Sequence, residues 1–171
     1  TVASVMGYEF TAQVVARVQK VQERELAKDL SRELEKRYRL VFEQGEIKIG
    51  KQFLSLYRFS HALTQQYLYD EVGVGERRML HGEIAETLEA IAVDHTDEFA
   101  LQLARHYDEA GNAEKAVSYW TLAGNAAFAI YAQNEAIAAY TRALELGKEA
   151  VITAEQFHHL YTHGGRAMEL L

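Results

Sequence analysis

The sequence predicts a mainly α protein, in which a small module of helices and a β-hairpin precedes an array of antiparallel helices. Three observations predict this class. The 171 residues include no proline and only eleven glycines, so few positions forbid a helix. Apolar residues recur at helical spacing through most of the chain, and they alternate as in a strand only between residues 40 and 59. An apolar content of 49% is enough for a globular core.

The first two elements are short amphipathic helices. Apolar side chains recur at helical spacing over residues 11–19, and leucines recur at every fourth position within residues 23–37. Both segments lack an internal glycine. We therefore expect one helix over each range.

A β-hairpin and a third helix follow. Between residues 40 and 59 the pattern alternates around glycines, which predicts two or three short strands. Ser60 occupies the position expected of an N-cap for a helix over residues 61–71. Helices followed by a hairpin and another helix indicate a winged-helix module over residues 1–72.

The segment 73–93 is predicted to be a connecting helix. Gly73 and Gly75 end the preceding helix, and apolar residues then share one face of a helix over residues 76–91. A short polar linker follows, in which Asp97 is placed to cap the next helix.

Residues 97–171 carry an internal repeat signal. Small and aromatic residues share one face of a helix over residues 100–107, and Gly111-Asn112 forms a turn. A long helix over residues 113–129 then faces back toward the first. Small residues let two helices approach closely, while aromatic rings fill the space between them.

This part of the chain resembles the tetratricopeptide consensus. The segment 135–144 is similar to the second helix of such a repeat and ends at Leu146-Gly147. Ala116 and Ala136 are 20 residues apart, whereas the usual period is about 34 residues, so we expect degenerate repeats. The helix around residues 157–171 is expected to be the first half of a truncated repeat. The consensus positions that carry the resemblance are Leu103, Ala104, Tyr107, Gly111, Ala116, Trp120 and Ala123.

The front of the chain is similar to another family. Residues 57–69 and 76–89, together with residues 2–10, resemble the winged-helix region of STAND signal-transduction ATPases, which include bacterial proteins with cyclase, kinase or LuxR-type output domains. The resemblance implies a preceding ATPase domain as a partner and ADP or ATP as cofactor of the whole protein. This chain has no G-x-x-x-x-G-K-[ST] stretch, so we expect it to hold no cofactor itself.

The same resemblance gives His61 a role. In that family a histidine that opens the winged-helix segment contacts the β-phosphate of ADP, and His61 matches it, although Ala62 stands where plant and animal members have aspartate. The structural alternative is that His61 only caps or packs at the junction of strand and helix.

The repeats are expected to bind a protein or peptide, with Tyr107, Trp120 and Tyr131 as candidate surface residues. The structural alternative is that these aromatic rings form the repeat core. Carboxylate pairs such as Asp97-Glu98 lie at expected helix ends, so we expect no catalytic residue.

Composition and motifs exclude several other classes of site. The chain has no cysteine, which rules out disulfides, thiolate zinc sites and thiol nucleophiles. Three histidines lie near the end, at positions 158, 159 and 163, and Glu155 is the single carboxylate near them, so we expect no metal. No apolar run approaches the roughly 18 residues of a membrane helix, and the start lacks the basic region of a signal peptide. We expect a cytoplasmic protein with no membrane partner. The chain begins and ends inside apparent helices without an initiator methionine, so we expect a segment of a longer protein.

Charge separates two functional hypotheses. Residues 1–60 hold eleven Lys/Arg against eight Asp/Glu, a net +3, while residues 61–171 hold seven against seventeen, a net −10. The helix over residues 23–37, which would read DNA, carries five charges of each sign, so we do not expect nucleic acid as a partner. Our leading hypothesis is a regulatory segment that couples nucleotide state to a helical-repeat sensor or scaffold. The alternative is a transcription regulator whose winged helix binds DNA and whose repeats recruit proteins.

Overall fold

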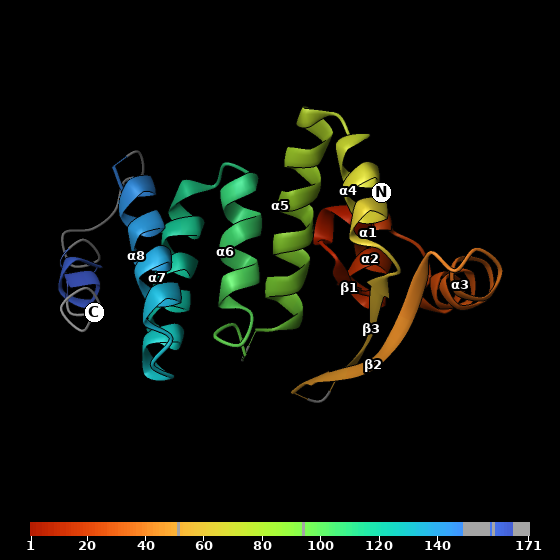
Figure 1. The fold of residues 1–171 in the computed structure, drawn as a ribbon, viewed down its shortest axis with the longest axis horizontal. Helices are drawn as coiled ribbons and strands as arrows, with labels where there is room; N and C mark the ends of the chain where they lie inside the picture. The colour runs from red at the N-terminus through yellow and green to blue at the C-terminus, as the bar shows by residue number, and fades with distance from the viewer. Residues whose placement is uncertain (51, 94, 149–157, 159, 166–171) are drawn as a thin grey trace. The chain divides into compact units, whose positions relative to one another are not determined.

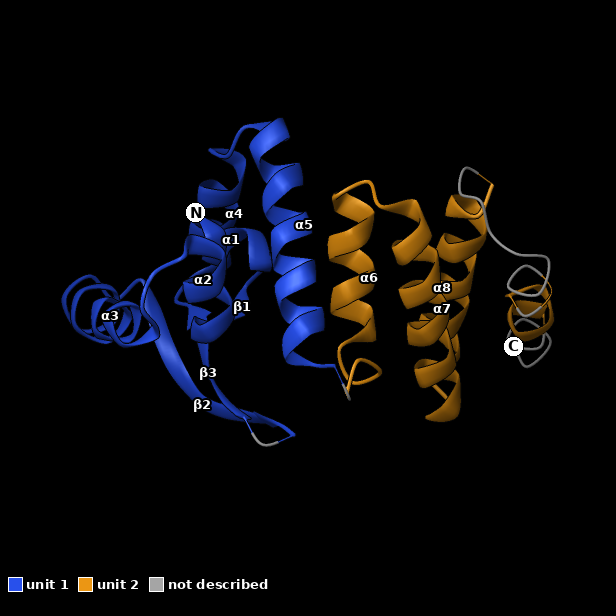
Figure 2. Ribbon diagram, turned by 180° about the vertical axis from the view of Figure 1, so that it is seen from behind, with its two compact units in different colours: residues 1–94 blue, residues 95–171 orange. Residues whose placement is uncertain are grey.

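The computed structural model describes residues 1–50, 52–93, 95–148, 158 and 160–165. They form a mainly helical protein, as predicted, with a small three-stranded antiparallel sheet (Figure 1). The chain divides into two compact units, residues 1–94 and residues 95–171 (Figure 2). Among the described residues, no helix is long and apolar enough to cross a bilayer.

The described residues of unit 1 form six helical segments and three strands. Its sheet has the strand order β1-β3-β2, with β3 paired to both neighbours. A register shift in the β2-β3 hairpin lies between Glu43 and Gly45, where Gly45 has a φ of 126°. The helical segments are α1 (Val2–Met6), α2 (Ala12–Gln19), α3 (Glu23–Asp29), the π-helix η1 (Leu30–Arg37), α4 (Ala62–Asp70) and α5 (Val74–Ile91), and the strands are β1 (Glu9–Thr11), β2 (Val41–Ile49) and β3 (Gln52–Phe59).

The core of unit 1 forms where α2 packs against β3 and α5. Phe10 of β1 is 1% exposed and stacks on Tyr57 of β3, with ring centroids 5.9 Å apart. Val14 and Val15 of α2 are also buried. The predicted apolar face of the 11–19 helix is therefore buried in this core.

Four details of unit 1 differ from the predictions. The elements before α2, helix α1 and strand β1, were not predicted, because five and three residues are too few for a periodic signal and the strand forms only by pairing with β3. The second half of the 23–37 helix is a π-helix, in which the Tyr38 amide donates to the Glu33 carbonyl at 2.9 Å. Helix α5 begins at Val74, so Gly75 lies inside the helix and only Gly73 precedes it. It packs against α1 and α2 and thus belongs to unit 1.

The fourth difference concerns the start of α4. The N-cap position is His61, and the side chain of His61 makes no capping hydrogen bond. The His61 carbonyl accepts from the Thr64 amide at 3.0 Å. Ser60, the expected cap, instead donates its hydroxyl to the Arg39 carbonyl. Its hydroxyl therefore ties the strand-to-helix junction to the segment that follows η1.

Unit 2 is built around its middle helix. Helix α7 packs against both α6 and α8, and its limits confirm the predicted 113–129 helix. Gly111 has a φ of 77°, and the side chain of Asn112 accepts from the Lys115 amide at 3.2 Å, which caps α7. The helices of this unit are α6 (Ala100–Glu109), α7 (Ala113–Ala129) and α8 (Gln133–Leu146), and residues 158 and 160–165 are also helical.

Helix α6 begins later than predicted. Phe99, not Asp97, holds the N-cap position of α6, because the residues before it form a turn. The predicted repeat helix over residues 157–171 falls largely outside the described residues. Leu160, which is described, is fully buried.

Two tyrosines fill the core of unit 2 from opposite sides of α7. Tyr107 of α6 is 1% exposed and stacks on Tyr119 of α7, with ring centroids 5.6 Å apart. Tyr140 of α8 is fully buried against Gly124 of α7, where an added Cβ would lie 2.6 Å from the Tyr140 Cε1 atom. Glycine at position 124 therefore permits the close approach of α7 and α8.

Candidate functional site

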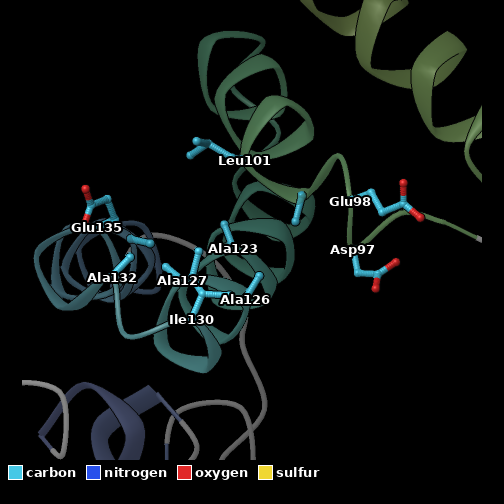
Figure 3. A pocket seen from close by; sticks show the side chains of 11 residues that line it. Asp97, Glu98, Leu101, Ala123, Ala126, Ala127, Ile130, Ala132 and Glu135 are labelled. Atoms are coloured by element: carbon cyan, nitrogen blue, oxygen red, sulfur yellow. The ribbon is translucent and has the colours of Figure 1, made fainter. Parts of the chain in front are cut away.

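A groove of about 510 Å³ crosses unit 2. Its lining comes from α6, α7 and α8 and from the turns that precede α6 and α8. Figure 3 shows Ala123, Ala126 and Ala127 of α7 between Leu101 and Ile130. The full lining is Asp97, Glu98, Ala100, Leu101, Ala123, Ala126, Ala127, Ile130, Ala132, Glu135 and Ala139.

Alanine makes the floor of this groove. Ala100, Ala123 and Ala139, one from each helix, form a buried cluster against which Trp120 and Leu122 pack. Because a methyl group is the smallest side chain with a Cβ, the floor stays close to the backbones of the three helices. The groove is thus a space left by small residues between helices that larger side chains hold in place.

The edge of the groove carries the larger groups. Leu101 is 45% exposed and Ile130 is 75% exposed, so both aliphatic side chains present much of their surface to solvent. Figure 3 shows Asp97 and Glu98 on one side of the alanine floor and Glu135 on the other. Glu98 lies 3.0 Å from the His95 imidazole. Within the described ranges, Asp97 and Glu135 make no ion pair.

A polar network joins the three helices that build the groove. Asp108 of α6 accepts two hydrogen bonds from the Arg142 guanidinium of α8, at 2.7 and 2.8 Å. The Trp120 indole of α7 donates to the same carboxylate at 3.1 Å. Hydrogen bonds to Asp108 and then to Glu145 raise the pKa of Arg142, so its charge is fixed. The network fixes the positions of α6, α7 and α8 relative to one another.

The aromatic candidates from the sequence lie around the groove but do not line it. Tyr107 is buried in the core, where the Lys115 ammonium donates to its hydroxyl at 3.0 Å, so its prediction as a surface residue is wrong. Trp120 is partly buried and packs behind the alanine floor. Tyr131 is 84% exposed, directly after the groove residue Ile130, and has a φ of 61°. Of the three candidates, only Tyr131 is largely exposed.

The structure places His61 at the entrance to α4. Its side chain is exposed, and its backbone has extended φ and ψ angles of −138° and 133°. The imidazole therefore lies beside the first turn of a nine-residue helix. That location is compatible with contact to a group outside this chain.

Unit 1 also contains a buried polar cluster at the junction of α4 and α5. His81 is 6% exposed, and its Nε2 atom lies 3.3 Å from the Tyr69 hydroxyl. The Arg77 guanidinium lies 4.2 Å from the centre of the Tyr69 ring and donates to the Val72 carbonyl at 3.0 Å. Burial and then the Arg77 charge lower the pKa of His81 to about 4. The imidazole is therefore neutral at physiological pH.

The histidines near the end of the chain are placed separately. His163 lies against the Tyr140 ring at a centroid distance of 6.5 Å, while His158 is exposed. His159 is outside the described residues. Among the residues that are described, no three His, Asp or Glu side chains gather as metal ligands would.

The sequence marked Asp97 and Glu98 as carboxylates at a helix end and Ala100 and Ala123 as core-facing positions, and it marked no groove. Alanines at positions 123, 126 and 127 fit both a helix–helix contact and plain helix propensity, so their exposure is not readable from the pattern. The available signal was the pair Leu101 and Ile130, whose large aliphatic side chains lie off the predicted core faces.

Comparison with protein-family models, curated proteins and solved structures finds no match for this chain.

Proposed function

We propose that this chain is a regulatory, protein-interaction segment of a STAND-type signalling ATPase. Unit 2 binds a protein partner in its groove, and unit 1 adjoins an ATPase domain whose nucleotide state it senses. The observation that carries the proposal is the groove itself, a preformed space of about 510 Å³ with an apolar floor and exposed aliphatic edges. The proposed activity is binding, since methyl groups and aliphatic chains supply most of the lining.

The order of elements in unit 1 supports the winged-helix part of the proposal. Helices α2 and α3 precede a β2-β3 hairpin, and the short β1 pairs with β3 to give the order β1-β3-β2. This is the arrangement we expect of helices with a wing. The charge balance of the 23–37 helix favours a protein-facing role over a DNA-reading one.

The placement of two tyrosines in unit 2 supports the tetratricopeptide-like part. Tyr107 and Tyr140 are 33 residues apart, and each packs into α7 from its own side. This spacing is close to the roughly 34-residue period of such repeats. This spacing makes α8 equivalent to α6. The 20-residue spacing of Ala116 and Ala136 had instead made α8 equivalent to the helix over residues 113–129. We propose that α6 and α8 are equivalent helices of consecutive repeats.

A peptide selection tests binding by the groove. We expect a phage library of random peptides, selected on the full chain, to yield binders that the variant Leu101→Asp/Ile130→Asp loses by more than about tenfold in affinity. The matched control is Val74→Asp/Met79→Asp, which alters two exposed aliphatic side chains of α5. Binders that tolerate the groove variant, or a selection that yields no binders, would overturn the proposal.

The nucleotide-sensing part is tested in the longer protein. We propose that the His61 imidazole donates to a phosphate of ADP, aided by the first turn of α4. His61→Ala should then weaken ADP retention and raise basal output, while the exposed His158→Ala should leave both unchanged. Unchanged ADP affinity in His61→Ala would contradict this role.

A further inference from the structure

We infer that the occupant of the groove is an amphipathic helix of a partner protein, with aliphatic side chains on the alanine floor and Lys or Arg at the acidic edges. The inference rests on the proposed function, because it names the partner class of the same site. Three features of the groove carry it: the spacing of its floor residues, the charge of its edges and the position of its exposed aliphatic side chains.

The floor has the periodicity of a helix surface. Ala123, Ala126, Ala127 and Ile130 of α7 line the groove and stand at positions i, i+3, i+4 and i+7. A row of small residues at this spacing forms a shallow channel along a helix, into which the side-chain ridge of a second helix fits. An amphipathic helix presents its apolar residues at the same i, i+3, i+4 and i+7 spacing.

The acidic edges of the groove indicate that the partner carries positive charge. Figure 3 places Asp97 and Glu98 on one side of the floor and Glu135 on the other, and no Lys or Arg is among the described residues that line the groove. Residues 95–171 hold five Lys/Arg against ten Asp/Glu, a net charge of −5, so the segment that contains the groove is acidic as a whole. A helix with basic residues on both flanks of its apolar stripe would meet carboxylates on both sides.

The exposed aliphatic side chains give the partner its contact area. Leu101 of α6 and Ile130 at the end of α7 present 45% and 75% of their surface to solvent on either side of the alanines. Aliphatic residues of a bound helix would cover both side chains and the floor together. Apolar burial would supply affinity, and the carboxylates would supply selectivity.

Three synthetic peptides test the inference with the full chain. Each has leucines at i, i+3, i+4 and i+7 and differs only in its polar residues, which are lysine, glutamine or glutamate. We expect the lysine peptide to bind at least about tenfold more tightly than the glutamate peptide, since contacts with Asp97 and Glu135 change from attraction to repulsion. The lysine peptide should gain helical circular dichroism on binding and lose affinity as salt is raised.

Two variants separate the groove from net charge. Asp97→Lys/Glu135→Lys should reverse the preference toward the glutamate peptide. Glu109→Lys/Glu114→Lys changes the charge of unit 2 equally at exposed carboxylates outside the groove, and should shift the preference by less than about twofold. An equal shift in both variants would overturn the inference, because binding would then follow net charge alone.

Further results would also overturn it. If a glutamine or glutamate peptide binds as tightly as the lysine peptide, the partner does not need basic residues. If a lysine peptide of scrambled sequence binds equally, the partner does not need an amphipathic helix. If the phage selection yields groove-dependent peptides without Lys or Arg, the inference fails and the proposed function stands. If it yields no groove-dependent peptide, the proposed function itself fails.

Discussion

The Asp108 carboxylate and the Arg142 guanidinium form a two-point hydrogen-bonded ion pair between α6 and α8, with distances of 2.7 and 2.8 Å. The Asp108 side chain is 15% exposed and the Arg142 side chain 43% exposed, so the pair lies at the edge of the core. Trp120 adds a third hydrogen bond from α7. One carboxylate therefore connects all three helices that build the groove.

We expect Asp108→Ala to lower the free energy of unfolding of unit 2 by about 2 to 3 kcal/mol, because it leaves two charged donors and one indole N–H without their acceptor. Urea titration followed by fluorescence measures this loss, since Trp120 is the single tryptophan. Glu145→Ala removes the more exposed partner of Arg142 and should cost less than about 0.5 kcal/mol. Equal losses in the two variants would show that the Asp108 network adds no stability.

Gly124→Ala is expected to destabilise unit 2 by about 1 to 3 kcal/mol, because the new methyl group would meet the buried Tyr140 ring. A hydrogen bond of 2.8 Å from the Tyr140 hydroxyl to the Asn125 side chain holds that ring in place. Thermal unfolding followed by circular dichroism measures the change. Gly75→Ala is the control, because no atom lies within 4 Å of the added Cβ, and helix propensity should stabilise it by up to about 1 kcal/mol. A Gly124→Ala protein that is more stable than the original chain would mean that the Tyr140 ring moves aside without loss of stability.

His81 gives stability a defined pH dependence. Its pKa is about 4 in the folded chain and about 6.5 when unfolded, so between these values the unfolded state binds a proton that the folded state does not. Stability is therefore lost as pH falls from about 6.5 toward 4 and changes no further below 4 through this group. We expect the loss to reach about 3 kcal/mol.

Comparison with His81→Asn isolates this contribution, because carboxylates titrate in the same range in both proteins. The difference in free energy of unfolding between the two proteins should shrink as pH falls from 7 to 4. Exposed His158→Asn should leave the profile of the original chain unchanged. A constant difference between the chain and His81→Asn would show that the imidazole is not held neutral.

Tyr131→Gly should stabilise unit 2 by up to about 1 kcal/mol, because a φ of 61° is strained for a bulky side chain and not for glycine. Tyr131→Phe keeps the strain and should change stability by less than about 0.5 kcal/mol. Chemical denaturation compares the two variants. If Tyr131 also contacts a partner, as predicted from the sequence, the Tyr131→Gly variant will be more stable than the original chain but will bind groove-selected peptides more weakly.

The helices of this chain were predictable where local signals agree. The start of α7 follows from the Gly111-Asn112 turn. The same dipeptide at Gly124-Asn125 lies inside the helix, where Gly124 faces the Tyr140 ring instead of ending α7. The hairpin was also predictable, because its alternation differs from the helical period on both sides. Strand β1 and the π-helical pairing of η1 depend on contacts made elsewhere in unit 1, and no local pattern encodes them.

The candidate site was less predictable than the fold. Tyr107 and Trp120 were predicted as surface residues because they are aromatic. Large rings at helical spacing usually fill cores, and both of these pack within unit 2. The groove instead arises where residues are small, and alanine is favoured in any helix regardless of exposure. Only the positions of three helices together convert these alanines into a floor.

The π-helix η1 is a place where the chain can lose a residue without disrupting the fold. A π-helical hydrogen bond spans five residues where an α-helical one spans four, so this segment already accommodates surplus backbone. Removing one residue between Ser31 and Glu35 would let the segment return to α-helical pairing. One residue removed from α7 would instead rotate Gly124 about 100° away from Tyr140. Insertions and deletions among descendants of this sequence should therefore gather in η1 and spare α7.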